Sequence, residues 1–411
     1  MIWIQYLPAA LIAFVVVLAS VVPLAALGLH YGWVYENKRA VRHVVMPPVP
    51  FVGGIAVLLG LIAAALFSAW PVETIGLAIG MVIVFLFGVA EDRAPIRRRF
   101  WFLGMAGAAA AAVIGGQQMI TTTGPVFGPF EIPLWIFSVP ATVAIVGVIA
   151  LGFRTIDRAD GLCDGQALIS TIALTVVAAI LAGQGSAAWP LPGFAVVSLS
   201  MIGALLGLAF YTFRRPGRRL AAVYLGSAGA MMLGLLVGWL GLQVHAGFGE
   251  AGIGLGGLLW LVAIPLTDLL FYVLRRVLAG SHWSAADKYR LYHWLKEQQF
   301  TVGQAVMITH GLSVAAATIG VVAWYLGVPD FLLFWAFCGA FAVYAITAMS
   351  FWTTRSLNKE NIAHWSTADQ TASADDPVTI DIEAHTVLGT FDEAPSNPNG
   401  FKPVAESRPG N

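Results

Sequence analysis

Charge is scarce in this chain. Only 11% of its 411 residues are charged, whereas 58% are hydrophobic. An ordinary soluble domain carries about 25% charged residues, so the composition excludes that class and indicates a membrane protein. Cysteine is scarce too, and Cys163 and Cys338 are too far apart in the sequence to indicate a disulfide framework. No stretch of the chain indicates a nucleic-acid partner.

Long apolar runs make up most of the chain. A transmembrane helix needs roughly 20 mostly apolar residues, and by this criterion the sequence predicts about eleven spans. An open sheet would leave edge groups unpaired in lipid, so the predicted fold is an all-α integral membrane bundle. The predicted spans are 7–30, 50–69, 74–90, 101–118, 135–153, 166–184, 191–212, 222–242, 255–274, 303–325 and 330–350.

Basic residues are missing from every second connection between these spans. All 22 Lys and Arg residues follow an odd-numbered span. The positive-inside rule therefore predicts that the odd-numbered loops and the C-terminus are cytoplasmic and that the N-terminus is outside. Residues 1–353 are predicted to form one polytopic membrane domain. The polar, acidic stretch 354–411 is predicted to be a disordered cytoplasmic tail.

The first group of chemically capable residues follows the third span. The stretch reads "GVAEDRAPIRRRF" and contains the adjacent acids Glu91 and Asp92. Carboxylate oxygens together with substrate phosphate suit a divalent cation such as Mg²⁺, and arginine suits phosphate. The alternative is an ordinary interfacial loop with the arginines expected on the inner side.

A second group follows the fifth span, in the stretch "RTIDRADGLCDG". On a helix, Asp157, Asp160 and Asp164 share one face. Clustered carboxylates repel one another unless a cation neutralises them. That cation is either a metal ion or the side chains of Arg154 and Arg158, and in the second case the stretch is a self-neutralised salt-bridge cluster.

Three further stretches complete the candidate site. One reads "YLGSAGAMMLG" and has Ser227 between glycines; its alternative role is helix packing. Asp268 lies inside an apolar run, where an acid is a functional candidate by default. The long loop "AGSHWSAADKYRLYHWLKEQQFT" is rich in charged and aromatic residues, and its alternative is an amphipathic interfacial helix.

Taken in order, these stretches resemble the polyprenyl-phosphate N-acetylhexosamine-1-phosphate transferases, the glycosyltransferase family 4 membrane proteins. The similarity runs from about residue 30 to residue 310, and the bacterial undecaprenyl-phosphate GlcNAc-1-phosphate transferases look like the closer branch. It includes "VRHVVMPPVPFVGGIAV", which matches a basic-His segment followed by a Gly-Gly pair.

This resemblance implies an enzyme that moves a sugar-1-phosphate (HexNAc-1-phosphate) from a UDP-sugar to polyprenyl phosphate and releases UMP. It implies a Mg²⁺ cofactor, an inner (cytoplasmic) membrane location with the active face cytoplasmic, and a role in cell-envelope glycan synthesis. A homodimer is one oligomeric state open to such a protein.

The resemblance also implies residue roles. Asp92, Asp157 and Asp160 are expected to be catalytic, and Glu91, Asp92, Asp157 and Asp160 are expected to ligate the metal. Substrate-binding positions fall on His43, Arg154, Arg158, Ser227, Asp268, Asp287, Lys288, Arg290 and His293.

Several of these positions differ from the family pattern. Arg154 stands in place of an asparagine, Ser227 in place of a metal-binding aspartate, and Arg290 in place of a histidine. In one explanation the enzyme is active, Asp164 supplies the carboxylate that Ser227 lacks, and Arg290 binds the diphosphate. In the other, the protein is a non-catalytic relative in which salt bridges, such as Arg154 with Asp157, fill the old metal site, and it binds a polyprenyl lipid or a membrane partner. A transporter or channel is less favoured, because the charges gather at the inner edge rather than at the bilayer midplane.

Overall fold

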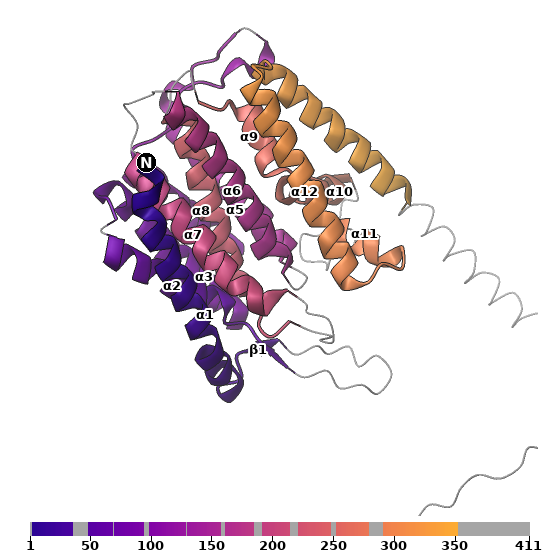
Figure 1. Ribbon diagram of the computed structural model, residues 1–411. Helices are drawn as coiled ribbons and strands as arrows, with labels where there is room; N and C mark the ends of the chain where they lie inside the picture. The colour runs from indigo at the N-terminus through magenta and orange to yellow at the C-terminus, as the bar shows by residue number, and fades with distance from the viewer. Residues whose placement is uncertain are drawn as a thin grey trace, which may run out of the picture. The chain divides into compact units, whose positions relative to one another are not determined.

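The computed structural model describes residues 2–35, 48–68, 70–93, 98–128, 130–157, 161–184, 191–213, 221–247, 252–278 and 291–351. The chain folds as a bundle of helices (Figure 1). Its α-helices are α1 Leu7–His30, α2 Gly53–Ser68, α3 Ile75–Arg93, α4 Arg98–Gly116, α5 Ser138–Ile156, α6 Leu162–Gly183, α7 Leu191–Thr212, α8 Gly226–Ala246, α9 Leu255–Leu261, α10 Ala263–Leu278, α11 Leu291–Glu297 and α12 Val302–Tyr325, followed by the helix Asp330–Phe351.

Short elements join the helices. The strands β1 Val34–Tyr35 and β2 Val49–Pro50 pair antiparallel. The 3₁₀ helices are η1 Ile2–Tyr6, η2 Val72–Thr74, η3 Pro125–Phe127 and η4 Trp135–Phe137. Between α4 and α5, Thr122 and Pro133 form an isolated antiparallel bridge.

The predicted all-α membrane fold is confirmed. Among the described residues, eight helices are long and apolar enough to cross a membrane, and the bent pair α9 and α10 would make a ninth. The apolar helices Gly53–Ser68 and Phe100–Gly116 are shorter. Each of the eleven predicted segments is thus helical, whereas the count of eleven crossings and the orientation of the termini stay predictions. The predicted tail, 354–411, lies outside the described residues.

The ninth predicted span is not one helix, because it breaks at Val262. The helices α9 and α10 meet there at 94°. Pro265 has no N–H to donate to the carbonyl of Leu261, and its ring crowds that carbonyl. Oγ of Ser170, on α6, donates a hydrogen bond to the freed carbonyl at 2.8 Å. The side chain from α6 thus satisfies a backbone group that lipid could not.

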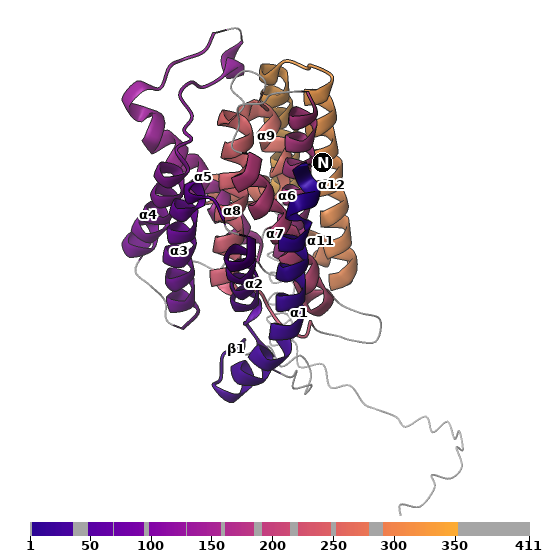
Figure 2. The ribbon, with the colours of Figure 1, turned by 60° about the vertical axis from the view of Figure 1, so that its left-hand side comes forward.

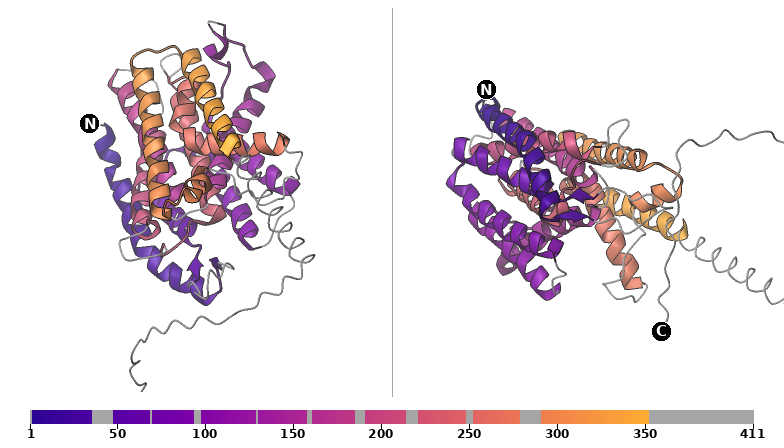
Figure 3. Two further views of the ribbon diagram at one scale, coloured as in Figure 1. Left: turned by 90° about the vertical axis from the view of Figure 1, so that its right-hand side faces the viewer. Right: turned by 90° about the horizontal axis from the view of Figure 1, so that it is seen from below.

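Helix α8 forms the centre of the bundle. Its residues from Ala228 to Val244 are all buried, and it packs against α2, α3, α5 and α6. Small residues bring the backbones together: a Cβ added at Gly88 of α3 would lie 2.2 Å from the Cα of Ala228. Such close approach is how membrane helices gain packing energy, because lipid and side chains are equally apolar. Seen from below, α1 to α4 gather on one side and the two last helices on the other (Figure 3).

The helix ends nearest the predicted site lie together at one end of the bundle. Helices α1, α3, α5 and α7 end there, and α2, α4, α6 and α8 begin there, at the bottom of Figure 2. Backbone hydrogen bonds join the start of α2 to the residues just before α8. The N–H of Gly53 donates to the carbonyl oxygen of Tyr224, and the N–H of Gly54 donates to that of Leu225, each at 2.9 Å. The predicted site residues on α3, α5 and α8 therefore share one end.

Candidate functional site

Asp92 lies against the N-terminus of α8. Gly226 has a φ of +80°, a conformation that favours glycine, and it turns the chain into the helix. The N–H of Ser227 then donates to Oδ1 of Asp92 at 3.2 Å. A carboxylate at a helix N-terminus satisfies an otherwise unpaired N–H and complements the helix dipole. Two of the predicted stretches, 135 residues apart, therefore meet through a hydrogen bond.

Glu91 forms an ion pair with Arg154. Nε of Arg154 donates to Oε2 of Glu91 at 3.0 Å, and Nη2 donates to Oε1. Nε1 of Trp101 donates to the same Oε2 at 3.0 Å, and the guanidinium lies 5.1 Å from the centre of the Trp101 ring. The non-catalytic explanation pairs Arg154 with Asp157, whereas in the structure Arg154 pairs with Glu91.

Asp157 and Asp164 lie near the facing ends of α5 and α6. Asp157 directly follows α5, and Asp164 lies in the first turn of α6. Asp164 is only 3% exposed, and its Oδ2 accepts a hydrogen bond from Oγ1 of Thr212 on α7. The structure thus places Asp164 against α7. This gives no support to the idea that it completes a carboxylate set with Asp92 beside Ser227.

Asp268 joins α10 to α11. It is 5% exposed, and its Oδ1 accepts a hydrogen bond from the N–H of Leu291 at 3.2 Å. His293 lies on the same short helix α11, two residues after its first residue. The remaining predicted site residues lie outside the described residues: His43, Arg158, Asp160, Asp287, Lys288 and Arg290.

Two side chains in this region were not expected from the sequence. Trp101 and Thr212 each donate to a predicted acid, Glu91 and Asp164 respectively. Neither residue stands in an acidic or glycine-rich stretch. The only sequence signal was the position of each near the inner end of a predicted span.

The described residues do not fit a magnesium ion. No group of three or more His, Cys, Asp or Glu side chains among them is arranged to hold a metal. Of the predicted acids, Glu91 accepts from Arg154 and Trp101, Asp92 accepts from Ser227, and Asp164 accepts from Thr212. Mg²⁺ prefers free carboxylate oxygens in near-octahedral geometry. The predicted metal site, which includes Asp160, therefore stays a prediction.

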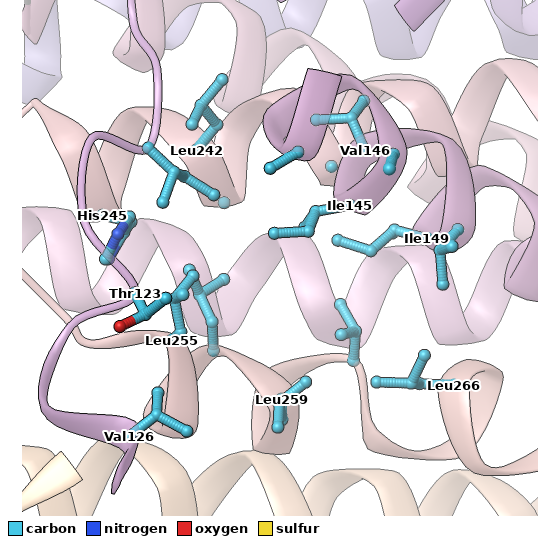
Figure 4. A pocket seen from close by; sticks show the side chains of 18 of the residues that line it. Thr123, Val126, Ile145, Val146, Ile149, Leu242, His245, Leu255, Leu259 and Leu266 are labelled. Carbon is cyan, nitrogen blue, oxygen red and sulfur yellow. The ribbon is translucent and has the colours of Figure 1, made fainter. Parts of the chain in front are cut away.

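An apolar cavity of about 480 Å³ lies farther along the bundle. It is formed by α5, α8, α9, α10 and the connection between α4 and α5 (Figure 4). Side chains such as Ile145, Ile149, Leu242 and Leu259 line it. His245 stands at its edge, where Nδ1 lies 2.8 Å from the carbonyl oxygen of Ile253. The cavity suits a hydrocarbon chain rather than a polar ligand.

The fold and the site define a class: a polytopic helical membrane protein with acidic and basic side chains joined at one end of the bundle and an apolar cavity beyond them. Comparison with known proteins narrows the class. The family model for Glycosyl transferase family 4 matches residues 74–245.

The chain is also similar to undecaprenyl-phosphate alpha-N-acetylglucosaminyl 1-phosphate transferases. The chain is 27% identical to the Escherichia coli K12 enzyme over 307 residues, which cover 74% of this chain and 81% of the relative. The identity is 28% over 307 residues for Yersinia pestis and 27% over 306 for Salmonella typhi, with the same coverage. These matches support the resemblance of the chain to glycosyltransferase family 4.

Proposed function

We propose that this protein transfers a HexNAc-1-phosphate from a UDP-sugar to polyprenyl phosphate and releases UMP. The observation that carries the proposal is the meeting of Asp92 with Ser227 at the N-terminus of α8. It joins two of the stretches on which the family resemblance rests, at the end of the bundle where positive charge also lies. A helix N-terminus and an arginine are both suited to phosphate.

In the proposed reaction, a phosphate oxygen of the acceptor attacks the sugar-bearing phosphorus of the donor. The bond from that phosphorus to the bridging oxygen breaks, and UMP leaves with the bridging oxygen and its electron pair. Positive groups that offset the charge on the phosphoryl oxygens favour such a transfer. Arg154 has five N–H donors, of which those on Nε and Nη2 serve Glu91, so others are left for a phosphate oxygen.

We assign the apolar cavity to the prenyl chain of the acceptor. The α8 residues that line the cavity lie between Gly238 and His245, which are 11 and 18 positions past Ser227. At 1.5 Å per residue this distance is roughly 16–27 Å along the helix. A long prenyl chain can span that distance with its phosphate near Asp92. The lining is apolar enough to replace lipid around the chain.

The distribution of basic residues indicates which side of the membrane the site faces. The site end of the bundle holds the helix ends that carry Arg93, Arg154 and the start of α4. By the positive-inside rule this end faces the cytoplasm, where UDP-sugars are made available. We therefore propose an inner-membrane enzyme with a cytoplasmic active face that begins an envelope glycan such as a lipopolysaccharide or cell-wall polymer.

The direct test is UMP release by the purified protein. The protein is incubated with undecaprenyl phosphate and each of several UDP-sugars, with and without Mg²⁺. We expect UMP release with at least one UDP-HexNAc, and a steep fall in Asp92→Asn, Asp157→Asn and Asp160→Asn. The proposed catalytic roles of Asp92, Asp157 and Asp160 are tested by the same series. No UMP release with any donor, from protein that is monodisperse and folded, contradicts the proposal.

A second function is favoured by one observation, the ion pair of Glu91 with Arg154. In this alternative the charges neutralise one another, and the protein is a non-catalytic relative that binds a polyprenyl lipid. It predicts that undecaprenyl phosphate raises the thermal stability of the protein while no UDP-sugar is consumed. Specific turnover by purified protein contradicts this alternative.

A further inference from the structure

We infer that Arg154 is the built-in counter-ion of Glu91 and takes the place of a divalent cation at this corner of the site. The first acid of the pair at 91 and 92 thus ligates no metal in this chain. This role of Arg154 rests on the proposed function of the site, and its test measures metal binding rather than turnover.

The contacts around Glu91 occupy both of its carboxylate oxygens. Oε1 accepts from Nη2 of Arg154, and Oε2 accepts from Nε of Arg154 and from Nε1 of Trp101. A carboxylate has about four lone-pair positions, so three N–H donors leave little for a metal. The two parallel bonds are the geometry for which the guanidinium fork is best suited.

Packing holds the arginine where it is. Its guanidinium lies 5.1 Å from the centre of the Trp101 ring, so the residue that donates to Glu91 also covers its partner. The side chains of Arg154 and Glu91 are only 28% and 20% exposed. Three helices thus contribute to one cluster: α3 provides Glu91, α4 provides Trp101 and α5 provides Arg154.

A divalent cation at Glu91 would have to displace the guanidinium or bind beside it. Displacement breaks two charge-assisted hydrogen bonds, and binding beside it sets like charges close together. Both are unfavourable in a half-buried environment, where charges are weakly screened.

The test uses Mn²⁺ as the probe and the full chain in lipid nanodiscs, with free Mn²⁺ followed by electron paramagnetic resonance. Arg154→Asn frees the carboxylate, and we expect Mn²⁺ affinity to rise at least tenfold. The gain should vanish in the double variant Arg154→Asn with Glu91→Gln. The matched control is Arg93→Asn, which removes the same charge from the same end of the bundle. Arg93 lies over Trp33 at 5.2 Å rather than on Glu91, so this control should leave Mn²⁺ affinity unchanged.

A second measurement covers the case in which Arg154→Asn does not fold. Glu91→Gln alone keeps the shape of the side chain, and we expect Mn²⁺ binding to equal that of the unaltered protein. A fall in Mn²⁺ affinity in Glu91→Gln overturns the inference, as does an Arg154→Asn variant that folds and gains no affinity. If the protein shows no transferase activity, the expected Mn²⁺ affinities are unchanged. The transferase function and the counter-ion role of Arg154 are therefore tested separately.

Discussion

Substituting Gly88 by alanine should separate α3 from α8 and so disturb the site. The new Cβ would lie 2.2 Å from the Cα and 2.7 Å from the backbone N of Ala228, and neither atom can swing away. Carbon atoms pack at about 3.5–4.0 Å, so the helices must move apart by roughly 1 Å or more. Asp92 lies one turn past Gly88 on the same face. Its 3.2 Å bond to Ser227 would then exceed hydrogen-bond length.

Overpacking of this kind costs about 1–3 kcal/mol. We expect Gly88→Ala to lower the thermal midpoint in detergent by several degrees and to reduce UMP release sharply. The control is Gly107→Ala on α4, where an added Cβ meets nothing within 4 Å. That variant should keep the stability and activity of the unaltered protein. If Gly88→Ala behaves like Gly107→Ala, the close packing of α3 on α8 does not position Asp92, and the reasoning is refuted.

Three further outcomes are expected. Ser170→Ala leaves the Leu261 carbonyl without its side-chain donor and should cost about 1–3 kcal/mol of stability, measured by thermal unfolding in detergent; unchanged stability would show that the carbonyl needs no partner from α6. Asp268→Ala removes the acceptor for the first N–H of α11, so trypsin should cleave near that helix faster than in the unaltered protein. Ala141→Phe narrows the apolar cavity and should raise the KM for undecaprenyl phosphate but not for the UDP-sugar. The exposed Ala106, which does not line the cavity, provides the control Ala106→Phe.

The helical fold could be predicted because apolar length is a property of local sequence. Each predicted span corresponds to helix, since a chain in lipid has few other ways to satisfy its backbone. The break at Val262 was missed although Pro265 was visible. Proline is tolerated in the first turn of a helix, where Pro265 lies in α10. Within a continuous apolar run, however, the sequence does not indicate that a new helix begins there.

The site was harder to predict because its contacts join residues that are far apart in the sequence. The acids were found from their clustering, but the choice between Asp157 and Glu91 as the partner of Arg154 depends on how α3 and α5 pack. Glu91 is 63 residues away, and its second donor, Trp101, comes from a third helix. Single-sequence patterns indicate which residues carry charge, whereas pairing depends on tertiary contacts.

The most direct test of the account is mass spectrometry of the lipid product. Purified protein is incubated with undecaprenyl phosphate and UDP-N-acetylglucosamine or another UDP-HexNAc, and the lipid fraction is compared with that of Asp92→Asn. The asparagine keeps an oxygen to accept from Ser227 but has no charge. The account predicts a diphosphate-linked HexNAc lipid, formed in equal amount with UMP, and at least about 100-fold less of it in the variant. Absence of that lipid for every donor, or equal formation by Asp92→Asn, would contradict it.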